Sequence, residues 1–268
     1  MNNFSEQIKS LGSGVAALIF AMSVVALGVL SWTDASADIT VTPHNLSSAG
    51  PGQTQEICVF CHTPHGGDTS ASVPLWNKSL ALPTAYTTYD TLGTSSNDGD
   101  IAPVGSVSIA CLSCHDGTQA IDSMINEPGS GFDSAGFIAD PGAMTGDPVL
   151  GQDLRDDHPI GVQYGGGGIS EGGTVGTSQG TVVDVDFISP VVDNVNGTTI
   201  WWVNTTAGGT AGREKEDMQL YTRNDGPSGL VEPFVECASC HDPHSEVNAT
   251  FLRVTNDGSE VCLSCHIK

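Results

Sequence analysis

The sequence predicts a mostly irregular fold of loops and short helices with one small β-hairpin. Of its 268 residues, 33 are glycine and 14 are proline, while aromatic residues make up only 6%. Glycine and proline favour turns, and few aromatic side chains leave little to fill a core. Apolar residues reach 38%, so we expect a modest core whose centre is filled by something other than side chains.

Two stretches in the second half of the chain show the apolar and polar alternation that is typical of strands. They span 181–188 and 198–204, and we expect them to pair as a hairpin after the glycine-rich tract at 161–180. Trp201 and Trp202 are adjacent, so in a strand they face opposite sides, and we expect one to be buried and the other half exposed. Helices are expected only as short segments near the cysteines.

The chain is strongly acidic, with 31 aspartate and glutamate residues against 8 lysine and arginine residues and a formal charge of −23. Such a charge disfavours nucleic acid and anionic membrane surfaces as partners because both are themselves negative. Basic proteins, metal ions and mineral surfaces fit the charge better.

The N-terminal segment resembles a cleaved export signal. Lys9 precedes an apolar run at 15–30, and Ala35-Ser36-Ala37 is a small-x-small site of the kind that signal peptidase cuts. The mature chain is therefore expected to begin at Asp38. An uncleaved membrane anchor is the alternative, but the run is shorter than the roughly 20 apolar residues that span a bilayer. No cysteine follows the cleavage site closely, which argues against a lipid anchor.

All eight cysteines occur in four copies of one motif, in which two residues separate two cysteines and a histidine follows the second. The copies are Cys58-Val-Phe-Cys61-His62, Cys111-Leu-Ser-Cys114-His115, Cys237-Ala-Ser-Cys240-His241 and Cys262-Leu-Ser-Cys265-His266. This spacing lets two thiols bond to the two vinyl groups of one haem, while the adjacent histidine turns beneath the ring to bind the iron. The sequence therefore predicts four covalently attached haem c groups.

Other uses of paired cysteines fit the pattern less well. A disulfide scaffold gives no reason for a histidine after every second cysteine. Zinc-binding knuckles do not need that histidine either, and they are commoner in proteins without an export signal. Thiol redox catalysis needs one exposed pair on a thioredoxin-like unit rather than four dispersed pairs.

The eight histidines equal the number of axial ligands that four haem irons need. The expected proximal ligands are the histidines of the four motifs: His62, His115, His241 and His266. The remaining histidines are the expected distal ligands: His44, His65, His158 and His244. Methionine is the competing distal ligand, but Met124, Met144 and Met218 are not needed to complete the count.

His65 and His244 each lie three residues beyond a proximal histidine, in Cys61-His62-Thr-Pro-His65 and Cys240-His241-Asp-Pro-His244. Neither can bind the iron of its own motif, because a three-residue segment rising about 1.5 Å per residue cannot pass around the edge of the macrocycle. To serve as ligands, His65 and His244 must each bind the iron of a neighbouring haem. A proline lies between the two histidines of each extension, and its fixed φ stiffens this segment.

Two histidines on every iron leave no open position for a substrate. We therefore predict electron transfer rather than catalysis, with no catalytic residues. Without a methionine ligand, and with acidic surroundings that stabilise ferric iron, the reduction potentials are expected to be low.

The spacing of the motifs predicts four regions. They are the signal peptide at 1–37, a region for the first two haems at 38–160, a glycine-rich β insertion at 161–225 and a region for the last two haems at 226–268.

The export signal, the four motifs, the Cys-His-Thr-Pro-His and Cys-His-Asp-Pro-His extensions and the glycine-rich insertion resemble the OmcE-like family of outer-surface tetrahaem cytochromes from metal-reducing microbes. The resemblance spans nearly the whole mature chain. It implies little regular secondary structure around a continuous haem chain, and subunits that polymerise end to end into a conductive extracellular filament, or nanowire.

The resemblance also implies partners. In that family one distal histidine is donated to the next subunit, and we expect His44 in this role, with His158 as the alternative. Redox donor proteins and extracellular acceptors such as metal oxides are the other expected partners. Two different functions stay open at this point: a monomeric periplasmic or surface shuttle, and a multihaem reductase with one open iron site.

Overall fold

The structure is a computed structural model that describes residues 39–48, 54, 56–93, 97–129, 143–168, 182–205 and 212–267. The expected signal peptide at 1–37 lies outside the described residues, as does most of the glycine-rich tract, from 169 to 180. In the described part of the chain, no helix is both long enough and apolar enough to cross a membrane.

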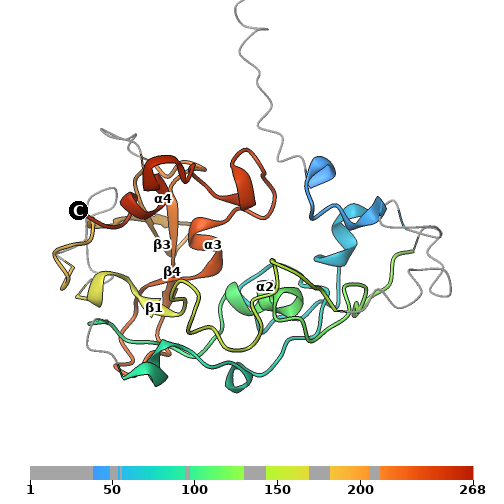
Figure 1. The fold of residues 1–268 in the computed structure, drawn as a ribbon, viewed down its shortest axis with the longest axis horizontal. Helices are drawn as coiled ribbons and strands as arrows, with labels where there is room; N and C mark the ends of the chain where they lie inside the picture. Colours follow the sequence, from blue (N-terminus) through green and yellow to red (C-terminus); the bar gives the residue numbers. More distant parts are fainter. Residues whose placement is uncertain are drawn as a thin grey trace, which may run out of the picture. The chain divides into compact units, whose positions relative to one another are not determined.

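One antiparallel sheet of five strands is the largest regular element (Figure 1). Its strand order is β1-β5-β4-β3-β2, and every pair of neighbours is antiparallel. The strands are β1 (Val162–Gln163), β2 (Val191–Val195), β3 (Thr198–Val203), β4 (Met218–Arg223) and β5 (Glu232–Val235). The sheet is larger than the small hairpin that the sequence predicts. Because β5 belongs to the expected C-terminal haem region, the sheet joins that region to the insertion.

The hairpin within this sheet is formed by β2 and β3 and turns at Asn196-Gly197. Both turn residues have positive φ, 52° and 84°, as a tight two-residue hairpin requires. β3 corresponds to the expected strand at 198–204, whereas the expected strand at 181–188 is wrong. Residues 182–188 form turns and bends instead, and Val183 and Val185 are 60% and 73% exposed.

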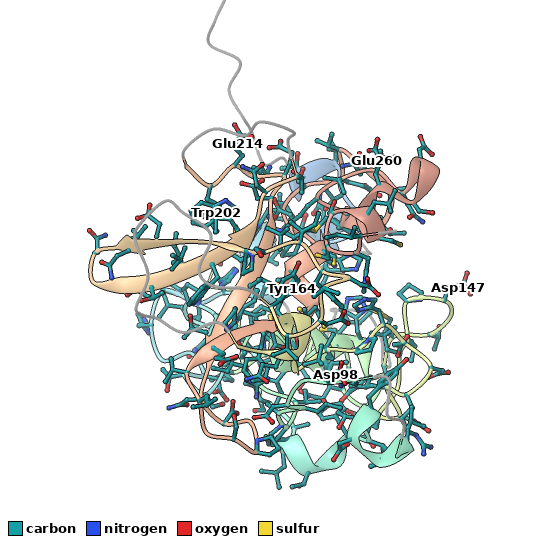
Figure 2. All side chains as sticks on the ribbon, turned by 90° about the vertical axis from the view of Figure 1, so that its left-hand side faces the viewer. Asp98, Asp147, Tyr164, Trp202, Glu214 and Glu260 are labelled. Carbon is teal, nitrogen blue, oxygen red and sulfur yellow. The ribbon has the colours of Figure 1, made fainter. Side chains whose placement is uncertain are left out.

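The expectation for the paired tryptophans is also wrong, because both are buried. Trp201 and Trp202 are 0% and 1% exposed, so each side of β3 is covered. Trp201 packs with Tyr164, Val203 and Met218 in a cluster that also contacts Cys240 and Cys265. Figure 2 shows Tyr164 surrounded by side chains and Trp202 on its strand. The sheet therefore provides an apolar surface for the third and fourth motifs.

The helices are short. The α-helices are α2 (Ser108–His115), α3 (Cys237–Cys240) and α4 (Glu260–Leu263). The 3-10 helices are η1 (Ile39–Val41), η2 (Leu46–Ser48), η3 (Ile57–Phe60), η4 (Pro83–Ala85), η5 (Tyr89–Leu92), η6 (Tyr164–Gly166), η7 (Ala249–Phe251) and η8 (Asp257–Ser259). Each of the four motifs begins in one of these helices: η3, α2, α3 and α4 in chain order. A second apolar cluster, which includes Trp76, Tyr86 and Leu112, packs against Cys61 of the first motif.

Candidate haem sites

Each motif places its two cysteines on a helical turn. In α3, for example, Cys237 and Cys240 are the first and last residues of the helix, so both side chains lie on one side of it. All eight cysteines are free thiols, of which Cys58 and Cys262 are exposed. Attachment to the two vinyl groups of one macrocycle needs two free thiols on the same side of a helical turn, and the motifs provide them.

The proximal histidines His62, His115 and His241 are oriented by the same kind of hydrogen bond. The Nδ1 atoms of His62, His115 and His241 each lie 2.8 Å from a backbone carbonyl oxygen, of Pro74, Pro148 and Thr250 respectively. A carbonyl oxygen can only accept, so Nδ1 carries the hydrogen and Nε2 keeps the lone pair. This is the tautomer in which imidazole binds a metal through Nε2, so the residues present fit a haem iron.

Strained turns supply two of these carbonyls. Leu75, directly after Pro74, has a φ of 54°, and Thr250 and Phe251 have φ values of 56° and 62°. Bulky and β-branched residues rarely adopt this conformation, and strain of this kind concentrates at functional sites. The backbone is thus bent at the two places where a carbonyl must reach His62 and His241.

Two pairs of imidazoles have the separation of ligands to one iron. Because metal–nitrogen bonds to histidine are about 2 Å long and each ring centre lies about 1 Å behind its nitrogen, trans imidazoles have centroids about 6 Å apart. The ring centroids of His62 and His244 are 6.2 Å apart, and so are those of His44 and His115. His244 therefore faces the proximal histidine of a different motif, as the argument against self-ligation expects.

His44 is held firmly in this position. Its Nδ1 lies 3.1 Å from the carbonyl oxygen of Pro243, and its ring stacks on Phe251 at 4.3 Å with planes 15° apart. Burial lowers the pKa of His44, which favours the neutral form that binds metal. The expectation that His44 reaches a neighbouring subunit does not agree with this geometry, because His44 lies beside His115 of its own chain.

The other two expected distal ligands are not paired in this way. His65 and His158 are both exposed, and neither ring contacts another imidazole within the described ranges. The Nδ1 of His158 lies 3.1 Å from the carbonyl oxygen of Pro159, which leaves its Nε2 available for a metal. The proximal His241 also has no second imidazole in ring contact among the described residues, and His266 packs against Phe187 at 4.3 Å.

Cysteines of successive motifs lie near one another in chain order. Cys111 of the second motif is in hydrogen-bonding contact with Cys237 of the third, and this contact, with burial, raises the pKa of Cys111. Cys114 acts electrostatically on Cys61 of the first motif, and Cys240 of the third acts on Cys265 of the fourth. Cysteines of successive motifs are therefore close to one another, and the pair of His62 and His244 also brings the first motif close to the third.

The thiols of Cys61, Cys240 and Cys265 are poorly suited to the alternative chemistries. Burial raises the pKa of Cys61 and Cys265 to about 12 and that of Cys240 to about 11. Zinc binding and thiol redox catalysis both need thiolates, which this environment disfavours. A thioether to a macrocycle is neutral and suits a buried site. Within the described residues, no group of three or more histidine, cysteine or acidic side chains is arranged around a common metal position.

Sequence reasoning missed three kinds of residue at these sites. Three histidines are held by backbone carbonyl groups, those of Pro74, Pro148 and Thr250, and a backbone carbonyl gives no signal in the sequence. Phe251 stacks on His44 from a turn with positive φ. Lys78 could have been noticed, since it is one of only eight basic residues in an acidic chain and is fully buried.

A comparison with protein families found one match. Residues 232–268 match the family model described as a doubled CXXCH motif, and this stretch contains the third and fourth motifs together with β5, α3 and α4. The match supports a multihaem c-type cytochrome, a class of electron-transfer proteins that bind haem c covalently. No curated protein matches the chain.

Proposed function

We propose that the chain is an exported tetrahaem c-type cytochrome, which transfers electrons through four bis-histidine haems and polymerises into an extracellular conductive filament. The observation that carries this proposal is the proximity of the attachment sites: cysteines of the first and second, second and third, and third and fourth motifs are neighbours. This proximity supports a path for electrons through the whole subunit.

The chain's own residues have three tasks in this proposal. The cysteines would hold each macrocycle, His62, His115 and His241 would bind iron through Nε2 because a carbonyl holds Nδ1, and the distal histidines would supply the second imidazoles. When bound, haem supplies an iron that alternates between the ferric and ferrous states. Because two imidazoles would leave an iron no place for a substrate, the proposal favours electron transfer over reductase chemistry, and no catalytic residue is proposed.

The tetrahaem assignment is tested by intact mass and by spectroscopy of the purified protein. We expect a mass that contains four haem groups, and we expect the assembled, reduced protein to bind no carbon monoxide. A smaller number of haems would contradict the assignment. Carbon monoxide binding to the assembled wild-type protein would instead favour a reductase, which needs an open iron site.

Two features support polymerisation. His65 and His158 are exposed ligands that face no other imidazole in the described part of the chain, so one of them is available to an iron in a neighbouring subunit. The resemblance to filament-forming cytochromes points in the same direction. In this proposal His158 replaces His44 as the residue donated between subunits, while redox proteins donate electrons and extracellular acceptors such as metal oxides receive them.

A monomeric shuttle is the second candidate, and the in-chain pair of His44 and His115 favours it. Electron microscopy of material sheared from expressing cells separates the two functions. Filaments that shorten or disappear in His158→Ala but persist in the matched surface variant Arg155→Ala would support polymerisation. Dispersed monomers with four bis-histidine haems in every sample would establish the shuttle.

A further inference from the structure

Lys78 is a buried cation next to the first two haem sites. Its side chain is 0% exposed, although lysine is rarely found fully buried without a partner. Moving an ammonium group out of water is costly, so a buried lysine needs compensating contacts. In a chain with a formal charge of −23, this position holds one of the few positive charges.

Three backbone carbonyls surround the ammonium group. The Nζ atom of Lys78 donates to the carbonyl oxygens of Ile121 and Ser123 at 2.9 Å each, and to that of Ala120 at 3.2 Å. An ammonium group has three N–H donors, whereas a neutral amine has two and would turn its lone pair toward an acceptor. The three carbonyls therefore match the three N–H donors of an ammonium group. Among the described residues, no carboxylate forms an ion pair with it.

The segment that carries Lys78 lies between the first and second motifs. The backbone N–H of Asn77 donates to the carbonyl oxygen of Cys61 at 2.9 Å, and Trp76 Nε1 donates to Ser113 Oγ at 3.3 Å. These two contacts hold the segment of Lys78 against one residue of each motif, so the buried ammonium group lies close to both motifs.

A second buried charge lies at only one of the two motifs. The carboxylate of Asp116, which is 4% exposed, accepts from Tyr86 Oη at 2.9 Å and from the N–H and hydroxyl of Thr118 at 2.8 Å each. Asp116 directly follows His115, so this negative charge lies beside the second motif.

We propose that Lys78 is a positioning residue that raises the reduction potential of the first two haem sites. A fixed positive charge in a low-dielectric interior repels ferric iron more than ferrous iron, so it raises the potential. The acidic chain as a whole acts in the opposite direction. Haems at these two sites are therefore easier to reduce with Lys78 present than they would be without it. This inference rests on the proposed haem binding at the first two motifs.

The test is a redox titration of the full, haem-loaded protein, followed by visible absorbance. Lys78→Gln and Lys78→Met both remove the charge, but glutamine keeps two hydrogen-bond donors. We expect both variants to show a more negative mean midpoint potential, with about a tenfold change in the oxidation equilibrium of the most affected site, or about 59 mV for one electron. Asp116→Asn is expected to shift the potential in the positive direction, and the exposed Arg155→Gln is expected to leave it unchanged.

Unchanged potentials in both neutral variants, with haem content intact, would overturn the proposal. Shifts of the same sign in the Lys78 and Asp116 variants would also overturn it, because loosened packing rather than charge would then explain them. Loss of haem from both neutral Lys78 variants but not from Lys78→Arg would assign the lysine a folding role instead. Failure of the proposed haem binding is recognised separately, because the wild-type protein would then carry fewer than four haems by mass.

Discussion

The orientation of a single imidazole decides whether it can serve as an axial ligand, and backbone carbonyls fix that orientation here. The Nδ1 atoms of these histidines lie 2.8–3.1 Å from a carbonyl oxygen: His44, His62, His115, His158 and His241. A carbonyl oxygen does not titrate in the physiological range, so the tautomer does not depend on a neighbouring side chain. Each of these histidines is therefore prepared for metal binding by the fold itself.

The pair of His62 and His244 leads to a prediction about one iron. In His244→Ala, the first site is expected to lose its distal ligand, so one haem per chain becomes high-spin and binds one carbon monoxide when reduced. Absorbance of the reduced protein with and without carbon monoxide measures this. Val247→Ala, on the same loop and 89% exposed in the wild type, is the matched control and is expected to bind none. Fully low-spin haem in His244→Ala would show that another residue is the ligand.

The position of His44 leads to a second prediction, which distinguishes ligation within a chain from ligation between chains. His44→Ala is expected to create one high-spin haem even in isolated monomers, because its partner is His115 of the same chain. Electron paramagnetic resonance of the ferric monomer is the measurement. An unchanged monomer spectrum together with a loss of assembly would instead place His44 between subunits.

At the scale of the elements, a buried polar cluster joins α2 to α3. Ser108 on α2 donates to the Glu236 carboxylate and accepts from the backbone N–H of Cys237 at 2.9 Å, while Arg223 on β4 pairs with the other Glu236 oxygen at 2.6 Å. Arg223 also donates to the carbonyl oxygen of Pro103 at 2.6 Å. The cluster therefore fixes the second motif against the third, where Cys111 and Cys237 meet.

Removing one member of this cluster leaves a buried charge without its partner. Arg223→Ala is expected to lower the free energy of unfolding by about 3–5 kcal/mol, since the Glu236 carboxylate stays buried. Denaturant titration followed by far-ultraviolet circular dichroism measures the change. The control variant Arg155→Ala breaks an exposed ion pair with Asp153 and is expected to leave the denaturant concentration at the unfolding midpoint unchanged. A midpoint for Arg223→Ala as high as the wild type's would mean that the cluster does not stabilise the fold.

The elements also show why sequence reasoning identified the motifs but misplaced much of the sheet. The cysteine spacing is local, so attachment sites follow directly from the residues. β5 contains Pro233, which argues against a strand, and yet that residue is paired opposite Thr222. The Asn196-Gly197 turn is the local signal that could have located the hairpin correctly. Distal pairs such as His62 and His244 depend on tertiary contacts, which no spacing in the sequence encodes.

At the scale of the whole molecule, charge opposes assembly. Subunits that each carry a formal charge of −23 repel one another, and salt weakens this repulsion because the screening length is about 30 Å at 0.01 M and about 8 Å at 0.15 M. If the proposed filament forms, its mean length is expected to increase between these two salt concentrations. Negative-stain electron microscopy measures the lengths, and filaments that are longer at low salt would contradict an assembly limited by charge.

The structure of the haem-loaded protein, determined by cryo-electron microscopy of material sheared from expressing cells, tests the central claim most directly. The account predicts four haems attached at the four motifs, with one iron between His62 and His244 and another between His44 and His115. Disulfides among the cysteines, or other ligand pairs at these two irons, would contradict it.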